Sequence, residues 1–354
     1  MKKNIITIFA VLFCAAILSP WAGGEAFAAD VGKLRVALVV NQRFGDNGPM
    51  DDMSKGADRA AADFGVEVKK LESSSAANFE EDVRAMSRAG YDLIITTFPY
   101  MSDSTKLVAA EYPKTMYSAI FQFINVGGVS IPNVWDTEFH GEGAFYLAGY
   151  LAGRATKTNR VGLVIGAEEP TPNAEGNAFM RGAKDANPGV TVDFAFVGSY
   201  EDPAKAKEIT SAMIAGGCDF VQANAGASGA GVVEAAKDAG VLCASEITDY
   251  YDGYRGFVGI VGIGFGETVY ASIKQLADGQ FPGGSHGIRG LANGGYFMDW
   301  PSYERFAAGD EKYGPALKSA IEEAKNIEKQ IVEGGREIAF DTEVPNWGRI
   351  SKEG

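Results

Sequence analysis

The chain has 354 residues, of which 46% are hydrophobic, 22% charged and 11% aromatic. These proportions are typical of a globular protein of about two domains, and they exclude a disordered chain or a marginal mini-protein. The 46 acidic residues outnumber the 32 basic ones and give a net charge of -14. Since such a charge repels phosphate backbones and anionic lipid surfaces, we expect no nucleic-acid partner.

Few side chains of this chain suit metal binding or acid-base catalysis. It contains two histidines, His140 and His286, and three cysteines, Cys14, Cys218 and Cys243. We therefore expect no metal or cofactor and no enzymatic activity. Cys218 and Cys243 lie in predicted strands of one sheet, so they are either two buried thiols or, in an oxidising compartment, a disulfide.

The first 28 residues have the pattern of a secretory signal peptide. Two lysines precede an apolar run over residues 5–18, and residues 26–28 (AFA) form a small-x-small cleavage site. The run of about 14 residues is shorter than the roughly 20 that span a membrane. Phe13 precedes Cys14 where a lipoprotein signal carries a small residue, so we expect no lipid anchor. Cleavage after residue 28 would release a periplasmic or otherwise extracytoplasmic chain.

Residues 34–124 alternate between short β-branched runs and helical periodicity. The pattern predicts strands over 34–40, 66–71, 92–97 and 116–120, and helices over 53–64, 79–89 and 102–111. Strands and helices that alternate with short loops require right-handed crossovers, which give a parallel sheet covered by helices on both faces. This region is therefore predicted to form one doubly wound lobe.

The same α/β alternation starts again near residue 142. It predicts helices over 142–155, 177–185, 203–215 and 231–239, and strands over 160–165, 190–197, 219–223 and 241–245. A strand over 257–263 and a helix over 267–276 are expected to return to the first lobe. We expect a charged helix within 312–336 to pack on the second lobe.

These patterns predict an α/β protein of two doubly wound lobes joined by a hinge. The first lobe is expected to comprise residues 33–124 and 251–285, and the second residues 125–250 and 286–350. Several crossovers between the lobes would form the hinge. Because ligands of such sheets bind beyond the carboxyl ends of the strands, the loops that follow strands are the expected binding site, in a cleft between the lobes.

Three of these loops carry groups suited to a polar ligand. Asn41 and Asp46 follow the first strand, Gly226 lies in a glycine-rich turn over 225–231, and Glu246 ends a strand. The glycine spacing of that turn differs from a dinucleotide fingerprint, and no lysine follows it as in a P-loop. The turn is better interpreted as a close-packed bend with one or two ligand contacts.

The aspartates of the first loop allow two interpretations. Asp46, Asp51 and Asp52 could form the metal-binding carboxylate cluster of a hydrolase. Alternatively, Asp51 or Asp52 could cap the helix that follows, by accepting hydrogen bonds from its free amides. The sequence leaves both interpretations open.

Several segments, taken in order, resemble the basic membrane protein family of ABC-transporter solute receptors, whose members include purine nucleoside receptor A-like lipoproteins. The most specific is VGSYEDPAKAKE over 197–208, and it is supported by residues 132–134, 142–149, 157–162 and 225–232. The resemblance implies a type I periplasmic-binding-protein fold that closes on a small ligand. It also implies delivery of that ligand, a purine nucleoside, nucleobase or similar heterocycle, to an ABC permease, and we expect a monomer.

The resemblance also assigns the binding residues, some of them altered. Asn41, Asp46 and Gly226 match the family's motifs, and Glu246 stands near its ribose-binding aspartate. The list of altered positions comprises Pro49 in place of a base-stacking phenylalanine, Met50 in place of an asparagine, Phe121 in place of an aspartate, Gly262 near the family's lysine, and Tyr200 as a replacement stacking partner. Phe121 would make the site more apolar, which places a free nucleobase beside a nucleoside as a candidate ligand.

Two other functions are compatible with the sequence. A sensor receptor would bind the same ligand but present its closed form to a membrane partner instead of supporting uptake. A nucleoside hydrolase would use the aspartates near Asp46. Since one fold hosts many functions, the family resemblance favours the transport receptor over both.

Overall fold

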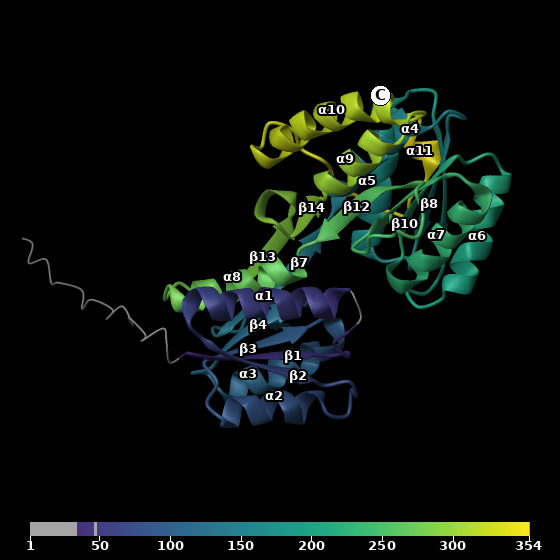
Figure 1. The fold of residues 1–354 in the computed structure, drawn as a ribbon. Coiled ribbons are helices and arrows are strands. Elements are labelled where there is room, and N and C mark those ends of the chain that lie inside the picture. Colours follow the sequence, from purple (N-terminus) through teal and green to yellow (C-terminus); the bar gives the residue numbers. More distant parts are fainter. Residues whose placement is uncertain (1–33, 46–47, 354) are drawn as a thin grey trace, which may run out of the picture.

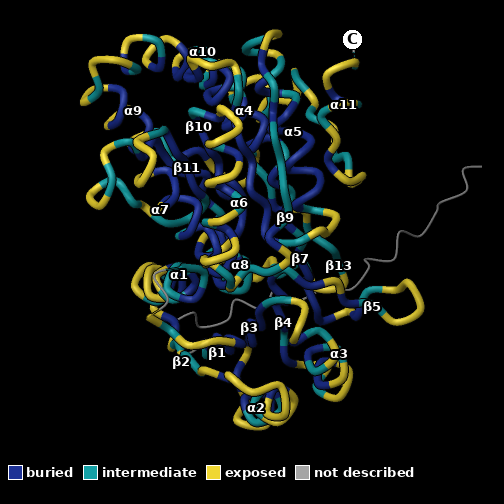
Figure 2. Tube along the Cα trace, turned by 90° about the vertical axis from the view of Figure 1, so that its right-hand side faces the viewer, coloured by how far each residue is buried: buried dark blue, intermediate teal, exposed yellow. Residues whose placement is uncertain are grey.

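The computed structural model describes residues 34–45 and 48–353 (Figure 1). The predicted signal peptide and Asp46 therefore lie outside the described residues. Two six-stranded sheets organise the chain, one in each lobe. In both lobes the strands are largely buried, while the outward faces of the helices are exposed (Figure 2).

The first sheet has the strand order β13-β7-β4-β3-β1-β2, and all its neighbouring strands are parallel. Its strands are β1 (Arg35–Val40), β2 (Glu67–Glu72), β3 (Leu93–Thr97), β4 (Met116–Ile120), β7 (Val134–His140) and β13 (Ser285–Gly290). Every residue of β3 is buried, as in a central strand that is covered on both faces. A short hairpin of β5 (Asn125–Val126) and β6 (Val129–Ser130) projects from this lobe.

Two pairs of helices cover the faces of the first sheet (Figure 1). One face carries α1 (Pro49–Phe64) and α8 (Phe265–Ala277), and the other α2 (Phe79–Arg88) and α3 (Ser102–Glu111). Successive β1 residues point to opposite faces, so Leu38 joins the core beneath α1, while Ala37 joins the core beneath α2.

The second sheet has the order β14-β12-β11-β10-β8-β9. Its strands are β8 (Arg160–Ile165), β9 (Thr191–Phe196), β10 (Phe220–Asn224), β11 (Leu242–Glu246), β12 (Phe257–Ile263) and β14 (Tyr296–Met298). All pairs are parallel except β12 with β14, which is antiparallel. Both sheets therefore direct the carboxyl ends of most of their strands to one edge, where the connecting loops gather.

The helices of the second lobe lie on both faces of its sheet. They are α4 (Glu142–Ala155), α5 (Pro170–Ala186), α6 (Pro203–Ala215), α7 (Gly229–Ala239), α9 (Trp300–Gly309), α10 (Gly314–Val332) and α11 (Trp347–Ile350). Helices α4 and α5 approach so closely that a Cβ atom on Gly149 would lie 2.0 Å from the Phe179 carbonyl oxygen. Glycine is thus required at this contact.

Within the described residues the chain passes between the two sheets three times. Gly141 connects β7 to α4, Gly264 connects β12 to α8, and residues 291–295 connect β13 to β14. Two of these connections touch, because the Gly264 amide donates to the Gly295 carbonyl at 2.8 Å. The lobes are therefore joined by a compact hinge with few side chains.

Three strands lie in the other sheet from the one expected from the sequence. β7 and nearly all of β13 fall in ranges assigned to the second lobe but pair in the first sheet, and β12, expected to return to the first lobe, pairs with β11. Each of these strands precedes a crossover, and only its hydrogen-bond partners show to which lobe it belongs. The expected return to the first lobe begins with α8 instead.

Cys218 and Cys243 are free, buried thiols in this structure, as in the first of the two interpretations. Burial raises the pKa of the Cys243 thiol far above its usual value, which makes it unreactive. Among the helices of the described part, none combines the length and apolar character needed to cross a bilayer.

Candidate functional site

Three strands end at residues with unusual backbone geometry. Phe98 follows β3 with φ of 61°, Phe121 follows β4 with φ of 54°, and Ile247 follows β11 with φ of 61°. Residues other than glycine rarely adopt positive φ, and such strain concentrates at functional sites. Because it recurs at the carboxyl ends of strands in both sheets, it marks these ends as the candidate site.

The strand ends of the first lobe carry a cluster of four phenylalanines, which we call the aromatic cluster: Phe98, Phe121, Phe139 and Phe265. The Phe121 ring lies edge-on to Phe98 and Phe139, with centroids 5.9 and 5.7 Å apart. Phe265 completes the cluster, 5.3 Å from Phe98 and 4.8 Å from Phe139. Phe98 and Phe121 are half-buried, so they give this end of the sheet a partly accessible aromatic surface.

The loop after β1 contains the other predicted residues of the first lobe. Asn41 is buried, and its side-chain oxygen accepts a hydrogen bond from the Thr97 hydroxyl at 3.1 Å, which ties the ends of β1 and β3 together. Pro49 is the first residue of α1, a position that suits its fixed φ. Asp46 lies outside the described residues, so its place in the site stays a prediction.

The two neighbouring aspartates have structural contacts. Asp51 accepts a hydrogen bond from the Gly45 amide at 2.7 Å, which closes the loop. Asp52 accepts from the Gly266 amide at 2.6 Å and so caps α8. Asp52 thus caps a helix, as in the second interpretation, but a different helix from the one expected, because α8 packs against α1 and brings its own free amides to Asp52.

The strand ends of the second lobe carry a group of hydrogen-bonded acids, which we call the carboxyl cluster: Glu169, Glu175 and Glu246. Glu175, on α5, is 2% exposed. Its two oxygens accept hydrogen bonds from the Tyr296 hydroxyl at 2.6 Å and the Asn224 side-chain amide at 2.8 Å. These three residues come from α5, β14 and β10, so tertiary packing assembles this part of the site.

Glu246 and Gly226, both predicted from the sequence, are brought together. The Gly226 amide donates to the Glu246 carboxylate at 2.6 Å. Gly226 has φ of 54° and opens the turn before α7, so its amide points across to the end of β11. The Ala225 amide also acts on this carboxylate, and the half-buried Glu246 keeps lone pairs with which it can accept from a ligand.

Tyr200, another predicted residue, packs against two glycines. A Cβ atom on Gly166 would lie 2.4 Å from the Tyr200 ring, and one on Gly226 would lie 3.3 Å from its Cβ. The Tyr200 hydroxyl donates to Glu169 at 3.3 Å. The structure therefore places the Tyr200 ring at the ends of β8 and β10, beside the carboxyl cluster.

Burial dominates the electrostatics of this cluster. It raises the pKa of Glu175 to about 8, against the opposing effect of the hydrogen bonds from Tyr296 and Asn224. It likewise raises the pKa of Glu246 to about 7, against the amides of Gly226 and Ala225. Near neutral pH both groups therefore exchange protons readily, which is typical of a functional site.

The aromatic cluster and the carboxyl cluster are connected. The Phe139 ring lies 6.4 Å from the Tyr296 ring, and Tyr296 in turn donates to Glu175. Gly141, at the first crossover, lies beside both, since a Cβ atom there would be 2.3 Å from the Glu175 carboxylate. The contacts thus run from the strand ends of one lobe, past the hinge, to those of the other.

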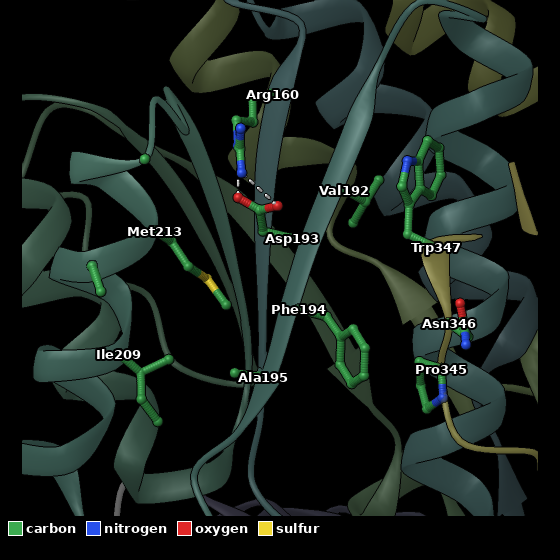
Figure 3. A pocket seen from close by; sticks show the side chains of 12 residues that line it. Arg160, Val192, Asp193, Phe194, Ala195, Ile209, Met213, Pro345, Asn346 and Trp347 are labelled. Carbon is green, nitrogen blue, oxygen red and sulfur yellow. Dashed lines mark hydrogen bonds and ion pairs between the residues drawn. The ribbon is translucent and has the colours of Figure 1, made fainter. Parts of the chain in front are cut away.

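A separate hollow lies on the outer edge of the second sheet (Figure 3). Edge strand β9 forms its floor, with Ile209 and Met213 of α6 on one side and Pro345 and Trp347 on the other. Arg160 and Asp193 form an ion pair within it, at 2.7 Å. The hollow is wide open and far from the strand ends that carry the strained residues and buried acids, so we do not assign the ligand to it.

Sequence reasoning missed seven residues of the site: Phe98, Phe139, Glu169, Glu175, Asn224, Phe265 and Tyr296. Phe98 directly follows a predicted strand, as Phe121 does, so the same rule would have found it. Glu175 lies in a segment that was predicted to precede its helix, whereas α5 begins at Pro170. Nothing local distinguishes Glu175 from a solvated acid, because its partners lie 49 and 121 residues away.

The family of the chain follows from its sequence as a whole. Residues 33–336 match a family model described as Bmp, ABC transporter substrate-binding protein PnrA-like. The chain belongs to this family. The type I periplasmic-binding fold and the resemblance inferred from the motifs are thereby confirmed. Proteins of this family bind small ligands outside the cytoplasm and work with permeases, and the related proteins are substrate-binding proteins rather than enzymes.

Two curated relatives illustrate the match. The ABC transporter nucleoside-binding protein BmpA of Lactococcus lactis subsp. cremoris is 26% identical over 322 residues, which cover 83% of this chain and 91% of that protein. Basic membrane protein A of Borreliella burgdorferi is 27% identical over 237 residues, which cover 67% and 68%. This member of the Bmp family is therefore aligned with its relatives over most of its length.

Solved structures show the same fold. An ABC transporter solute-binding protein from Aeropyrum pernix K1 superposes with a TM-score of 0.70 at 22% identity, covering 88% of this chain and 94% of the other. A second one, from Conexibacter woesei, has a TM-score of 0.70 at 20% identity and covers 89% and 99%. At these identities the likeness establishes the fold alone.

Proposed function

We propose that this Bmp-family protein binds a small heterocyclic ligand, a purine nucleoside or nucleobase, between its lobes and delivers it to an ABC permease. The contacts that join the aromatic cluster to the carboxyl cluster carry this proposal. Aromatic rings provide a surface on which a flat ring can stack, and carboxylates accept hydrogen bonds from ring nitrogens and hydroxyls. The nucleoside-binding name of the Lactococcus relative supports this ligand class.

Residue roles follow from the geometry. Phe121 and Phe98 would contact the face of the ring, and Tyr200 its edge or opposite face. Glu246 would accept from ligand hydroxyls or N–H groups through the lone pairs that the amides of Gly226 and Ala225 leave free. Asn41, Asp46, Pro49 and the Gly226 turn stay predicted contacts. The protein would act as a monomer, exported by cleavage of residues 1–28 and without a lipid anchor.

A thermal-shift panel on the chain without its predicted signal peptide tests this function. It compares purine nucleosides, nucleobases, pentoses, hexoses and amino acids. A ligand at about 100 times its Kd adds roughly 2.7 kcal/mol of stability, which raises Tm by several degrees in lobes of this size. Shifts with nucleosides but not with bases would assign ribose recognition to Glu246. Shifts with sugars or amino acids alone would contradict the proposed ligand class.

A pair of variants on one loop tests the aromatic surface. Phe121→Asn removes the ring but suits the positive φ of this position, and we expect it to weaken ligand binding about tenfold, which corresponds to about 1.4 kcal/mol. Phe123→Asn is the matched control, because Phe123 is 66% exposed and packs outward against His286. Equal affinities for the two variants, measured by calorimetry, would remove Phe121 from the site.

A further inference from the structure

The first residues after four strands of the second sheet include acidic side chains and no basic one; Arg255, later in the loop after β11, pairs with Asp252 at 3.8 Å. The four ranges are residues 166–169, 197–202, 225–228 and 246–250. Their acidic residues are Glu168, Glu169, Glu201, Asp202, Glu246 and Asp249. Since the proposed function places the ligand at these strand ends, the excess of acids bears on the charge of the ligand.

Two of these acids have partners within the protein. Asp202 caps α6 by accepting from the Lys205 amide at 2.9 Å. Asp249 forms an ion pair with Arg305 at 2.8 Å. Helix capping and ion pairing therefore explain Asp202 and Asp249, but not the acids of the carboxyl cluster.

The carboxyl cluster lacks a positive partner. Its hydrogen-bond donors are neutral: the hydroxyls of Tyr200 and Tyr296, the Asn224 amide and the Gly226 amide. In the part of the chain that the structure describes, no lysine or arginine forms an ion pair with Glu169, Glu175 or Glu246. The exposed ammonium of Lys205 lies beside Gly198 instead. Of the three, Glu175 is buried, Glu246 is half-buried and Glu169 is exposed. A carboxylate removed from water without a counter-ion is costly, so the pair Glu175 and Glu246 is unusual unless a ligand supplies the charge.

The groups that face the carboxyl cluster from the surrounding elements add negative charge. Glu142 on α4 and Glu246 on β11 both raise the pKa of Glu175 further. Glu169, Glu246 and Glu175 together raise the pKa of the Tyr200 hydroxyl, after burial. A histidine, His140, lies 4.0 Å from Glu142. A positive charge placed at Glu246 would therefore relieve this repulsion.

The aromatic cluster suits the same kind of ligand. Phe98 and Phe121 are half-buried and belong to the opposite lobe. The face of an aromatic ring attracts a cation, and this attraction strengthens when water is excluded. One side of the site thus presents ring faces, and the other presents carboxylates with no counter-ion.

We propose that the ligand of this protein carries a positive charge: it is a flat heterocycle with a protonated or quaternary nitrogen, held between the ring faces of Phe98 and Phe121 and the carboxylate of Glu246. The proposal rests on the proposed function, because it takes the strand ends of the two lobes as the binding site. It narrows the ligand class from neutral bases and nucleosides to their cationic counterparts.

Two matched pairs of probes isolate the charge. 1-Methyladenosine is protonated at neutral pH, whereas its isomer N6-methyladenosine is neutral. 1-Methylnicotinamide is a permanent cation, and nicotinamide is its neutral counterpart. Neither compound of this pair contains ribose. The affinities are measured by calorimetry at pH 7, with the chain that lacks its predicted signal peptide. In at least one pair, we expect the cationic member to bind about tenfold more tightly than the neutral member, or better.

The proton balance provides a second readout. A bound cation favours the charged forms of Glu246 and Glu175, so binding should release protons, and the affinity for 1-methylnicotinamide should rise from pH 6 to pH 8. Titrations in two buffers of different ionisation enthalpy measure this release. Glu246→Gln should reduce the preference for the cation about tenfold, whereas Glu201→Gln, an exposed acid of the neighbouring loop, should leave it unchanged.

The possible outcomes separate the two proposals. If N6-methyladenosine binds as well as 1-methyladenosine or better, and nicotinamide as well as its cation, the charge proposal is overturned while the heterocycle function stands. If the cations bind more tightly and release protons, both stand. If neither member of either pair binds a protein whose circular dichroism shows it to be folded, the proposed ligand class and its charge both fail.

Discussion

The part of the site in the second lobe depends on Glu175, whose carboxyl group is buried between Tyr296 and Asn224. Glu175 receives a hydrogen bond on each oxygen, yet burial still raises its pKa to about 8. Its folded-state pKa therefore lies above the value of 4.5 that it has when exposed. The stability that this group contributes is fully present below about pH 4.5 and is lost as the pH rises through about 8.

This shift predicts the pH dependence of unfolding. Glu175→Gln removes the titrating group, so the decline of Tm between pH 5 and pH 9 should become shallower than in the unaltered protein. Thermal unfolding followed by circular dichroism across this range measures the slope. Glu208→Gln on α6, whose carboxyl shows no such burial, is the control. An unchanged slope for Glu175→Gln would mean that the carboxyl ionises in the folded protein as freely as in water.

At the scale of elements, the close approach of α4 and α5 fixes the helix that carries Glu175. A Cβ on Gly149 would lie 2.0 Å from the Phe179 carbonyl oxygen, and one on Gly182 would lie 1.9 Å from the Tyr146 carbonyl oxygen. Backbone cannot move aside as a side-chain end can, so these glycines set the distance between the helices. The position of Glu175 in the site thus depends on residues that never touch a ligand.

Two alanine substitutions on one helix test this packing. Gly149→Ala should lower the free energy of unfolding by about 1 to 3 kcal/mol, because the added methyl overpacks the contact. Gly143→Ala on the same helix has its nearest neighbour at 3.4 Å, an ordinary contact, and should be neutral or slightly stabilising through helix propensity. Chemical denaturation measures both. A Gly149→Ala variant as stable as Gly143→Ala would show that the helices can separate without cost.

The segment after α10 provides a second element-scale test. Asn177, on α5, is fully buried and donates from its side-chain amide to the Asp341 and Glu343 carbonyls, at 2.9 and 2.8 Å. Asn177→Ala leaves both acceptors unpaired and should cost about 1 to 3 kcal/mol of stability. Denaturation monitored by tryptophan fluorescence measures the loss, since Trp347 lies in the same segment. A loss below about 0.5 kcal/mol would indicate that water replaces the amide.

The extent to which the sequence predicts this structure differs between elements. Strands β4, β8 and β12 coincide with their predictions, because short apolar β-branched runs bounded by turns need no tertiary information. β7 (VWDTEFH) has three consecutive polar residues at its centre and was not predicted as a strand, and β13 (SHGIRG) has almost no apolar pattern. Both lie at one edge of the first sheet, where pairing and not hydrophobicity defines the strand.

The same distinction holds for the site. Residues that directly follow a strand, such as Asn41, Phe121 and Glu246, could be predicted because parallel sheets collect such residues at one edge. Glu175 and Tyr296 could not, since a helix and an antiparallel strand bring them there. Which of the predicted residues contact a ligand is a question for binding measurements.

For the whole molecule, the hinge determines how the two halves of the site meet. Its connections touch at Gly264, where a Cβ atom would lie 1.9 Å from the Gly294 carbonyl oxygen. The crossovers therefore pack as one unit, and motion of either lobe must be shared between them.

This packing predicts a long-range effect on binding. Gly264→Ala forces two crossovers apart, so we expect it to weaken ligand affinity several-fold and to reduce the ligand-induced decrease in radius of gyration, although Gly264 is not a proposed ligand contact. Small-angle scattering and calorimetry measure the two effects. Gly189→Ala is the control, because its nearest neighbour is a side-chain atom at 3.5 Å in a distant loop. Unchanged closure in Gly264→Ala would place the hinge motion elsewhere.

The strand order of the first sheet also governs the sequence in which the protein can fold as it is made. β13 closes the edge of that sheet beside β7, yet nearly 150 residues, including most of the second lobe, separate the two strands. Until residue 290 has been synthesised, β7 is an unpaired edge that can associate with other strands. The first lobe to emerge is therefore completed only after five of the six strands of the second sheet have been made, and its open edge must be protected during that interval.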